Sequence, residues 1–387
     1  MRENLTYGLT RGQGKQSGKY RNCALVLLYN DILFKKEKMK KLYIIITSLI
    51  IILLNTCTEN PINGDNNIPP GRRDYVWTVF ANPFQGAFFR SLWGSSPNDI
   101  WVCGDAIDSR MTLWHFDGNN WIPSNEYIIW PTYLLGFSSS NIWLSTANSE
   151  IWHYDGSDWT LFQKLEYPGF ADVVIERMWG KAPNDIYASG FANAIDNYEG
   201  IILHYDGVEW KFMNIEKIRV NFSEIFYDDN SSIFITHALN FDGLGTYHRV
   251  YTLNGNILKQ IYAGEILTNI SYIQGSVYII HFDVQNLDAK VYKYSAGGLK
   301  LWKDFTNTNF LGRMWGRSEA DFFTETRNKG ELKRGIGHYN GTDLITIYPI
   351  IDDWSTSDAI VFDSEVVILY QNQFDNTNHL LIGRLKN

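Results

Sequence analysis

The chain has 387 residues, 45% of them hydrophobic and 15% aromatic, a length that suits two or three average domains or one large repeat domain. Residues 58–387 hold 24 basic and 39 acidic side chains, and this net charge of −15 would repel a phosphate backbone, so nucleic-acid binding is not expected. The many Trp, Tyr and Phe residues favour a β-rich fold, because flat rings pack well on a pleated sheet.

The first recognisable element is a targeting segment at residues 39–57, MKKLYIIITSLIIILLNTC. A basic start precedes an apolar run of thirteen residues, Leu42–Leu54. As a helix this run spans about 20 Å, whereas a hydrocarbon core is about 30 Å thick. The pattern therefore predicts a secretory signal peptide. Residues 1–38 show no domain pattern, and we interpret them as an over-extended start, with translation beginning at Met39.

The end of this segment, LLNTC, resembles the lipobox of bacterial lipoproteins. The resemblance implies that Cys57 is diacylated and becomes the mature N-terminus, although Asn55 and Thr56 stand where small residues are usual. An uncleaved anchor and ordinary signal cleavage remain alternatives. In all three cases the basic flank stays inside the cell, so the body of the protein is expected outside the cytoplasm, in the cell envelope.

Residues 58–73, TENPINGDNNIPPGRR, are polar and rich in Asn, Pro and Gly. This composition predicts a flexible tether between the membrane and the folded body. Once Cys57 is acylated, Cys103 is the only cysteine of the mature chain, so no internal disulfide is expected.

The body, residues 74–387, repeats one unit. The clearest copies are LWHFDGNNW at Leu113, IWHYDGSDW at Ile151, ILHYDGVEW at Ile202 and IGHYNGTDL at Ile336. Seven copies recur at intervals of 42 to 47 residues, marked by Asp99, Asn141, Asp185, Ser232, Ser276, Asp321 and Glu365. Because a four-stranded propeller blade takes about 40–50 residues, the repeat predicts a seven-bladed β-propeller with antiparallel blades.

Each unit divides into strands a, b, c and d, with DG or NG forming the tight c–d turn. The aromatic residues Trp93, Trp101 and Trp121 are expected to pack between neighbouring blades. The seventh copy ends after strand c, at HLLIGRLKN, whereas DYVWTVFANP at Asp74 precedes the first copy and places Trp77 like the Trp of other d strands. The N-terminal strand is therefore predicted to close the last blade, which removes an open sheet edge.

The repeats resemble those of a group of secreted bacterial propellers with WGxSxNDIW and HYDGxxW motifs, common among lipoproteins of Bacteroidetes-like bacteria. The resemblance covers about residues 74–387 and implies the fold. It says little about activity, because most of these proteins are uncharacterised. Some carry a glucosyltransferase label that no residue of this chain supports.

Four histidines recur at one repeat position, and the ring symmetry places them in different blades: His115, His153, His204 and His338. Histidines so placed cannot converge on one metal ion, and motifs such as HExxH are missing from the sequence. We therefore expect hydrogen-bonded sheet histidines, with neither metal nor cofactor. No nucleophile elbow is present, and the adjacent acids Asp228 and Asp229 are interpreted as a solvated loop.

The long b–c loops and d–a links fall on one face of the ring, where binding sites are usually placed. One repeat position, two residues before the strand-a aromatic or its equivalent, is expected near the channel mouth. It carries Ser91, Tyr133, Arg177, Glu224, Thr268, Arg313 and Ser357. Arg177 and Arg313 suit the carboxylate or sulfate of a glycan, or else they pair with acids such as Glu176 and Glu224. Trp130 and Trp354, in d–a links, either stack on a ligand or cover the blade tops.

The sequence favours a membrane-anchored lipoprotein whose propeller is a non-catalytic scaffold for an envelope protein or glycan. The alternative is a carbohydrate-active enzyme with acids and arginines at the channel mouth. An enzyme of this kind needs Glu224 beside a second carboxylate in a deep pocket, about 5–10 Å apart. Arginines neutralised by neighbouring acids at a shallow mouth favour the scaffold.

Overall fold

The computed structural model describes residues 71–386 except for positions 82–86, 125–126, 242–245, 284, 287, 328–333, 351–353 and 373–377. The proposed start region, the signal peptide, Cys57 and the tether up to residue 70 lie outside the described residues. None of the helical segments within the described ranges has the length and hydrophobicity that a membrane crossing requires.

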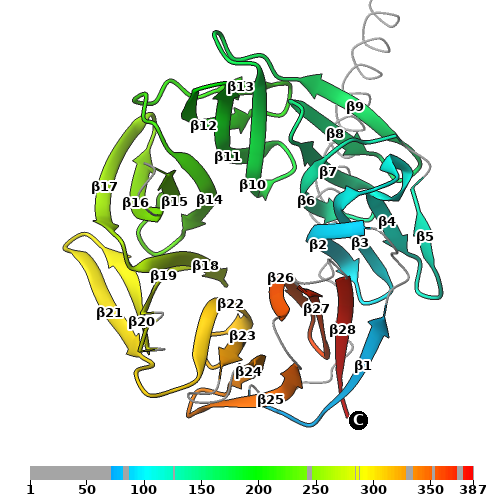
Figure 1. Cartoon of the computed structure of the whole chain (residues 1–387), viewed down its shortest axis with the longest axis vertical. Coiled ribbons are helices and arrows are strands. Elements are labelled where there is room, and N and C mark those ends of the chain that lie inside the picture. Colours follow the sequence, from blue (N-terminus) through cyan, green and yellow to red (C-terminus); the bar gives the residue numbers. More distant parts are fainter. Residues whose placement is uncertain are drawn as a thin grey trace, which may run out of the picture. The chain divides into compact units, whose positions relative to one another are not determined.

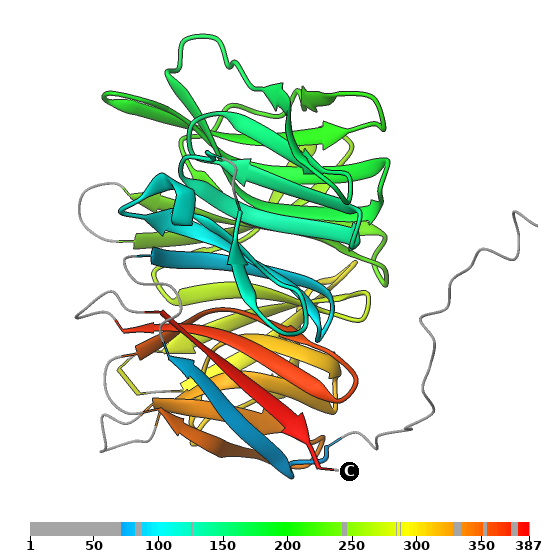
Figure 2. The same ribbon diagram turned by 90° about the vertical axis from the view of Figure 1, so that its right-hand side faces the viewer.

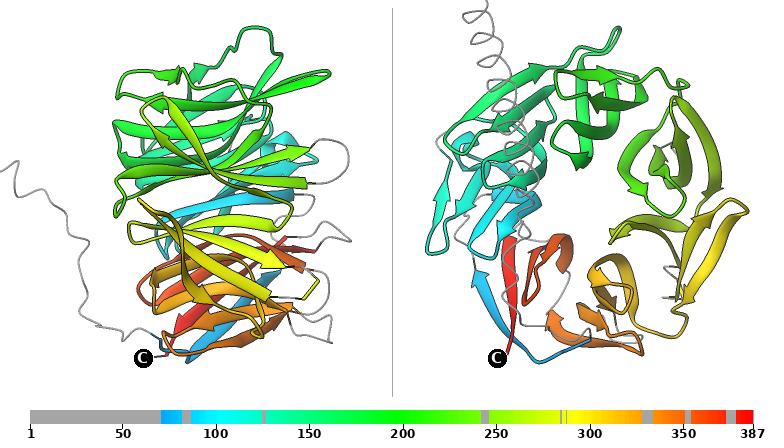
Figure 3. Two further views of the ribbon diagram at one scale, coloured as in Figure 1. Left: turned by 90° about the vertical axis from the view of Figure 1, so that its left-hand side faces the viewer. Right: turned by 180° about the vertical axis from the view of Figure 1, so that it is seen from behind.

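The described strands form seven sheets of four strands each, arranged as a ring (Figure 1). Seen from the side, the sheets are twisted and packed face to face, and the view from behind shows the same closed circle (Figures 2 and 3). All described strand pairs within a sheet are antiparallel. The predicted seven-bladed, all-β propeller is confirmed.

The blades follow the chain in order. Blade 1 comprises β2 (Ala87–Ser96), β3 (Asp99–Ala106), β4 (Leu113–Phe116) and β5 (Trp121–Pro123), with the short helix η1 (Ser109–Met111). Blade 2 comprises β6 (Pro131–Ser138), β7 (Asn141–Thr146), β8 (Glu150–Tyr154) and β9 (Trp159–Lys164). Blade 3 comprises β10 (Asp172–Ala182), β11 (Asp185–Ala194), β12 (Asn197–Tyr205) and β13 (Trp210–Phe212).

Blade 4 comprises β14 (Asn221–Asp228), β15 (Ile233–Phe241), β16 (Thr246–Asn254) and β17 (Ile257–Gly264). Blade 5 comprises β18 (Leu267–Ile273), β19 (Ser276–Asp283), β20 (Asp288–Ser295) and β21 (Gly298–Asp304). Blade 6 comprises β22 (Phe310–Ser318), β23 (Asp321–Arg327), β24 (Arg334–Tyr339) and β25 (Leu344–Ile350). Blade 7 comprises β26 (Trp354–Val361), β27 (Glu365–Asn372), β28 (Asn378–Leu385) and β1 (Tyr75–Ala81).

The N-terminal strand closes the ring as predicted. β1 pairs antiparallel with β28, from Tyr75 opposite Leu385 to Ala81 opposite His379, and the two ends of the chain's colour scale meet in this blade (Figure 1). Trp77 lies opposite Gly383, where a Cβ atom would come within 2.6 Å of the indole ring. The glycine is therefore needed for the close approach of the ring.

The repeated DG pairs form the c–d turns. In blade 1 the carboxylate Oδ1 of Asp117 accepts hydrogen bonds from the backbone N–H groups of Asn119 (2.8 Å) and Asn120 (2.7 Å). Gly118, which follows Asp117, has φ 93°, a conformation that residues with an L side chain rarely adopt. In blade 2 the same backbone bonds to Asp155 lower the pKa of its carboxyl to about 2. The repeated Asp and Gly are thus turn residues.

Aromatic residues fill the spaces between blades, as the sequence predicts. Trp101 of blade 1 packs against Tyr154 and Trp159 of blade 2, with ring centroids 5.0 and 5.4 Å apart. The next blade repeats the arrangement, because Trp143 packs against Tyr205 (4.8 Å) and Trp210 (5.7 Å). Burial of these large rings supplies much of the hydrophobic stabilisation between neighbouring sheets.

Candidate functional site

The four repeated histidines bond to the first residue of strand b within their own blades. Nε2 of the histidine lies close to a side-chain oxygen in the pairs His115–Asp99 (2.7 Å), His153–Asn141 (3.0 Å), His204–Asp185 (2.8 Å) and His338–Asp321 (2.7 Å). Each imidazole also packs on the aromatic residue two positions further along strand b, as His115 does on Trp101 at 4.2 Å. The motif residues NDIW and WHYDG are therefore one structural unit.

Strands a of the seven blades surround the centre of the ring (Figure 1). Four of the candidate residues lie on them: Tyr133 on β6, Arg177 on β10, Glu224 on β14 and Arg313 on β22. In most of these strands the register with strand b shifts next to the candidate position, as between Ile175 and Arg177. Such bulges redirect a side chain from the regular alternation of the sheet.

The structure brings these four side chains together. Oε1 of Glu224 lies 3.2 Å from Nη2 of Arg177 and 2.5 Å from Nη2 of Arg313, and the Glu224 side chain is only 1% exposed. The guanidinium of Arg177 lies 4.5 Å from the centre of the Tyr133 ring. Of the two alternatives for the arginines, the structure shows the pairing with Glu224.

A second buried carboxylate, at a position that the repeat spacing does not identify, belongs to this group. The repeat position was assigned to Ser357, but a bulge between Thr356 and Asp358 shifts the register, and Asp358 is the buried residue. Burial raises the pKa of Asp358, while Arg177 and Arg313 counteract this shift. Burial opposes the charge of Arg177, but Tyr133, Glu224 and Asp358 together raise its pKa above the usual value.

The two carboxylates also tie neighbouring blades together. Oε2 of Glu224 accepts a hydrogen bond from the backbone N–H of Ile270 in blade 5 (3.3 Å), and Oδ2 of Asp358 accepts one from Leu92 in blade 1 (3.2 Å). Hydroxyl groups make equivalent inter-blade bonds, from Leu134 N to Ser91 Oγ (3.2 Å) and from Met314 N to Ser271 Oγ (2.9 Å). We name Arg177, Arg313, Glu224, Asp358 and Tyr133 the axial cluster: its formal charges balance, and its acids are engaged in structure.

A hydrogen-bonded row of side chains lies beside the axial cluster. Oγ of Ser223 is 2.7 Å from Nδ1 of His237, and Nε2 of His237 is 3.1 Å from Nδ1 of His248. A serine that is hydrogen-bonded to a histidine, which is in turn held by a second polar side chain, is the arrangement that activates a nucleophilic hydroxyl group. However, burial, His248 and the nearby Arg313 lower the pKa of His237 to about 3. An imidazole that resists protonation so strongly is a poor general base at neutral pH.

Of the two candidate tryptophans, the structure describes the side chain of Trp130 only. Trp130 is 57% exposed and has φ 50°, a strained backbone conformation for a bulky residue. Its carbonyl accepts a hydrogen bond from Ala147 N (2.8 Å), which fixes it beside the b–c loop of blade 2. Trp354 is not in a d–a link as expected, because it is the first residue of β26, and its side chain is outside the part of the chain that the structure describes.

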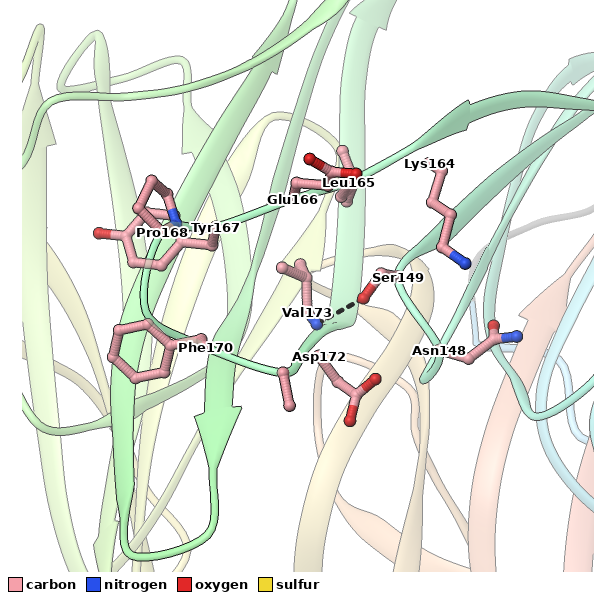
Figure 4. Close-up of a pocket in the computed structure, with 11 residues that line it drawn as sticks. Asn148, Ser149, Lys164, Leu165, Glu166, Tyr167, Pro168, Phe170, Asp172 and Val173 are labelled. Atoms are coloured by element: carbon pink, nitrogen blue, oxygen red, sulfur yellow. Dashed lines mark hydrogen bonds between the residues drawn. The ribbon is translucent and has the colours of Figure 1, made fainter.

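A pocket of about 620 Å³ lies between that b–c loop and the link from β9 to β10 (Figure 4). The sequence gives no signal for this pocket, because the link carries no repeated residue. Its lining comprises Asn148, Ser149, Lys164, Leu165, Glu166, Tyr167, Pro168, Phe170, Ala171, Asp172 and Val173. In the described part of the chain no three His, Cys, Asp or Glu side chains are grouped as a metal site requires.

Comparison with known proteins identifies the fold and no family. No family model matches the chain, and no curated protein matches it in sequence. A catalytically inactive variant of virginiamycin B lyase from Staphylococcus aureus, solved with quinupristin, is 12% identical, with a TM-score of 0.55 over 79% of this chain and 99% of that one. YCF48 bound to D1 peptide is 11% identical, with a TM-score of 0.55 over 82% and 100% of the two chains. At these identities the similarity shows a shared propeller fold.

Proposed function

We propose that the protein is a membrane-anchored lipoprotein of the cell envelope whose propeller is a non-catalytic scaffold that binds a protein or glycan. The observation that supports a non-catalytic scaffold is the pairing of the charged groups in the axial cluster. Both of its acids pair with arginines or hold backbone N–H groups of the next blade. Carboxylates committed in this way are not available as the acid and base of a glycosidase.

The face formed by the b–c loops and d–a links, called the loop face here, supports binding. Large apolar side chains are exposed on it at Ile107, Tyr127, Trp130, Ile195 and Ile266. Ile195 is fully exposed, and Ile107 is 94% exposed. At the described c–d turns on the opposite face, Val208 (77%) and Ile257 (73%), which follows the turn of blade 4, are the large apolar side chains with comparable exposure. Aromatic and apolar residues exposed on one side of a rigid ring suit an interface.

Two proteins with the same fold were solved with a bound molecule, one with a peptide and one with quinupristin. These structures support the proposal that this propeller also binds a ligand. The anchor is supported by the sequence around Cys57, which has the basic start, short apolar run and terminal cysteine of a lipoprotein signal. A single acyl chain binds membranes only marginally, so the two chains of a diacylated cysteine suit stable anchoring.

Replacing the lipidation residue tests the anchor. We expect Cys57→Ala to abolish incorporation of labelled palmitate, because no other thiol lies at the end of the signal segment. Cys103→Ala is the matched control and should leave labelling unchanged, since that thiol is fully buried. Labelled Cys57→Ala protein would disprove lipidation at this residue.

Charged substitutions on the loop face test the scaffold. With the full chain as bait in extracts of the source cell envelope, we expect Ile195→Asp and Ile107→Asp to weaken capture of a partner about tenfold or more, since each places a charge in an apolar contact. Val208→Asp on the opposite face, where the side chain is 77% exposed, should bind as the unmodified protein does. Equal capture by all three variants would exclude the loop face as the interface.

A further inference from the structure

The pocket between blades 2 and 3 is built on rigid backbone. Ser149 has φ 71° and is held at three points: its N–H donates to Val173 O (3.2 Å), its carbonyl accepts from Leu165 N (2.7 Å), and its Oγ accepts from Val173 N (2.7 Å). A strained residue persists only where its surroundings fix it, and such residues gather at ligand sites. The pocket therefore needs little ordering before it binds, and its volume is typical of small-molecule sites, about 300–1,000 Å³.

The two sides of the pocket differ in chemistry (Figure 4). Tyr167, Pro168 and Phe170 lie on one side, and Lys164 and Asn148 on the other, with Val173 and Ser149 between them. The hydroxyl of Tyr167 donates to Glu199, so Tyr167 offers the pocket its ring and not its hydroxyl. A ligand that fills this pocket needs one apolar surface and one polar edge.

The polar groups of the lining have no charged partners of their own. Lys164, Glu166 and Asp172 form no ion pair with any residue that the structure describes, and all three side chains are exposed. Charges of both signs lie on one rim, so a strongly anionic or cationic ligand would meet repulsion as well as attraction. Hydroxyl groups both donate and accept hydrogen bonds, and so they match an ammonium and a carboxylate equally well.

Trp130 extends the site beyond the pocket. Its carbonyl accepts a hydrogen bond from the backbone N–H of Ala147, the residue that precedes the lining residue Asn148 on the b–c loop. Its indole is exposed and its backbone is strained, two properties with no use in the packing of a blade. A ligand longer than the pocket could therefore extend along the b–c loop toward this indole.

From these observations we propose that the pocket and Trp130 bind a neutral oligosaccharide. A sugar ring has apolar C–H faces and a rim of hydroxyl groups, which match the aromatic side and the mixed charges of the pocket. Extended peptides are usually bound by main-chain pairing along an exposed strand edge. Here most of the lining comes from a loop and a link, and the strands contribute only Lys164 at the end of β9 and Asp172 and Val173 at the start of β10, too short a stretch for main-chain pairing along a strand edge. The inference rests on the proposed function, because it names the ligand class for one part of the loop face.

The test is an array of neutral oligosaccharides of glucose, xylose, mannose and galactose, probed with the full chain, with immobilised peptides in a second arm. We expect binding to at least one saccharide series and an about tenfold or greater loss in Asp172→Ala and in Trp130→Ala, since each removes a charged hydrogen bond or a stacking surface. Asp158→Ala and Val208→Ala, on the opposite face, are the matched controls and should bind normally. Melting temperatures of all four variants separate lost contacts from lost folding.

The outcomes separate the two proposals. No saccharide binding, or full binding by both Asp172→Ala and Trp130→Ala, overturns the oligosaccharide site. Peptide binding that depends on the same two residues also overturns it, and leaves the scaffold function intact. Capture of a partner that is insensitive to Ile195→Asp and Ile107→Asp refutes the loop face itself, whatever the array shows.

Discussion

Deletion of β1 (Tyr75–Ala81) is expected to unfold the whole propeller cooperatively. β1 supplies the outer strand of blade 7, and its loss exposes the edge of β28 along seven residue pairs. It also removes Tyr75, which packs edge-on against Phe323 of blade 6 at 5.4 Å and whose hydroxyl accepts a hydrogen bond from Arg317 (3.1 Å). The deletion therefore opens both the last sheet and the contact between blades 6 and 7. Thermal unfolding followed by circular dichroism measures the effect.

Point variants of the same strand show whether side chains or main-chain pairing carry the closure. Trp77→Ala leaves a cavity above Gly383, and we expect it to lower the free energy of unfolding by about 2–4 kcal/mol. Val76→Ala, at a side chain that is 52% exposed, should change it by less than about 0.5 kcal/mol. A deletion variant that melts at the temperature of the intact chain would contradict the interlocked closure.

The architecture was predictable because it repeats. A turn residue, a strand-b aromatic and a strand-c histidine recur in one order, and each recurrence has a local cause: the carboxylate of Asp117 caps its own turn, and Asp99 bonds His115 within one sheet. Local causes depend only on spacing along the chain. The number of blades and the position of β1 follow from the same spacing, since a blade that lacks strand d must find it elsewhere.

The centre of the ring was predictable only in part. Counting from the strand-a aromatic identified Arg177, Glu224 and Arg313, but it selected Ser357 in blade 7 instead of Asp358. A β-bulge adds a residue to one strand, and the sequence gives no sign of where the extra residue lies. The pocket was missed for a different reason, because it is lined by a link of irregular sequence and its shape depends on the contacts of Ser149 with Leu165 and Val173.

Removal of the central carboxylate is the second large effect. We expect Glu224→Gln to lower the free energy of unfolding by about 3–5 kcal/mol, because Arg177 would keep its charge without its closest buried counterion. The backbone N–H of Ile270 could still bond to the amide oxygen, so most of the loss is electrostatic. Urea denaturation of the full chain measures the change. Glu209→Gln removes a surface pair with Lys211 (2.8 Å) and should cost no more than about 1 kcal/mol.

A double variant identifies the cause. If the unpaired charge is what destabilises Glu224→Gln, then adding Arg177→Met should recover part of the loss, because the buried guanidinium and its missing partner disappear together. If Glu224→Gln costs as little as Glu209→Gln, the axial cluster is well solvated and its arginines are not committed to Glu224. Arg177 and Arg313 would then be available to clamp the carboxylate or sulfate of a ligand, and the centre of the ring would compete with the pocket as the binding site.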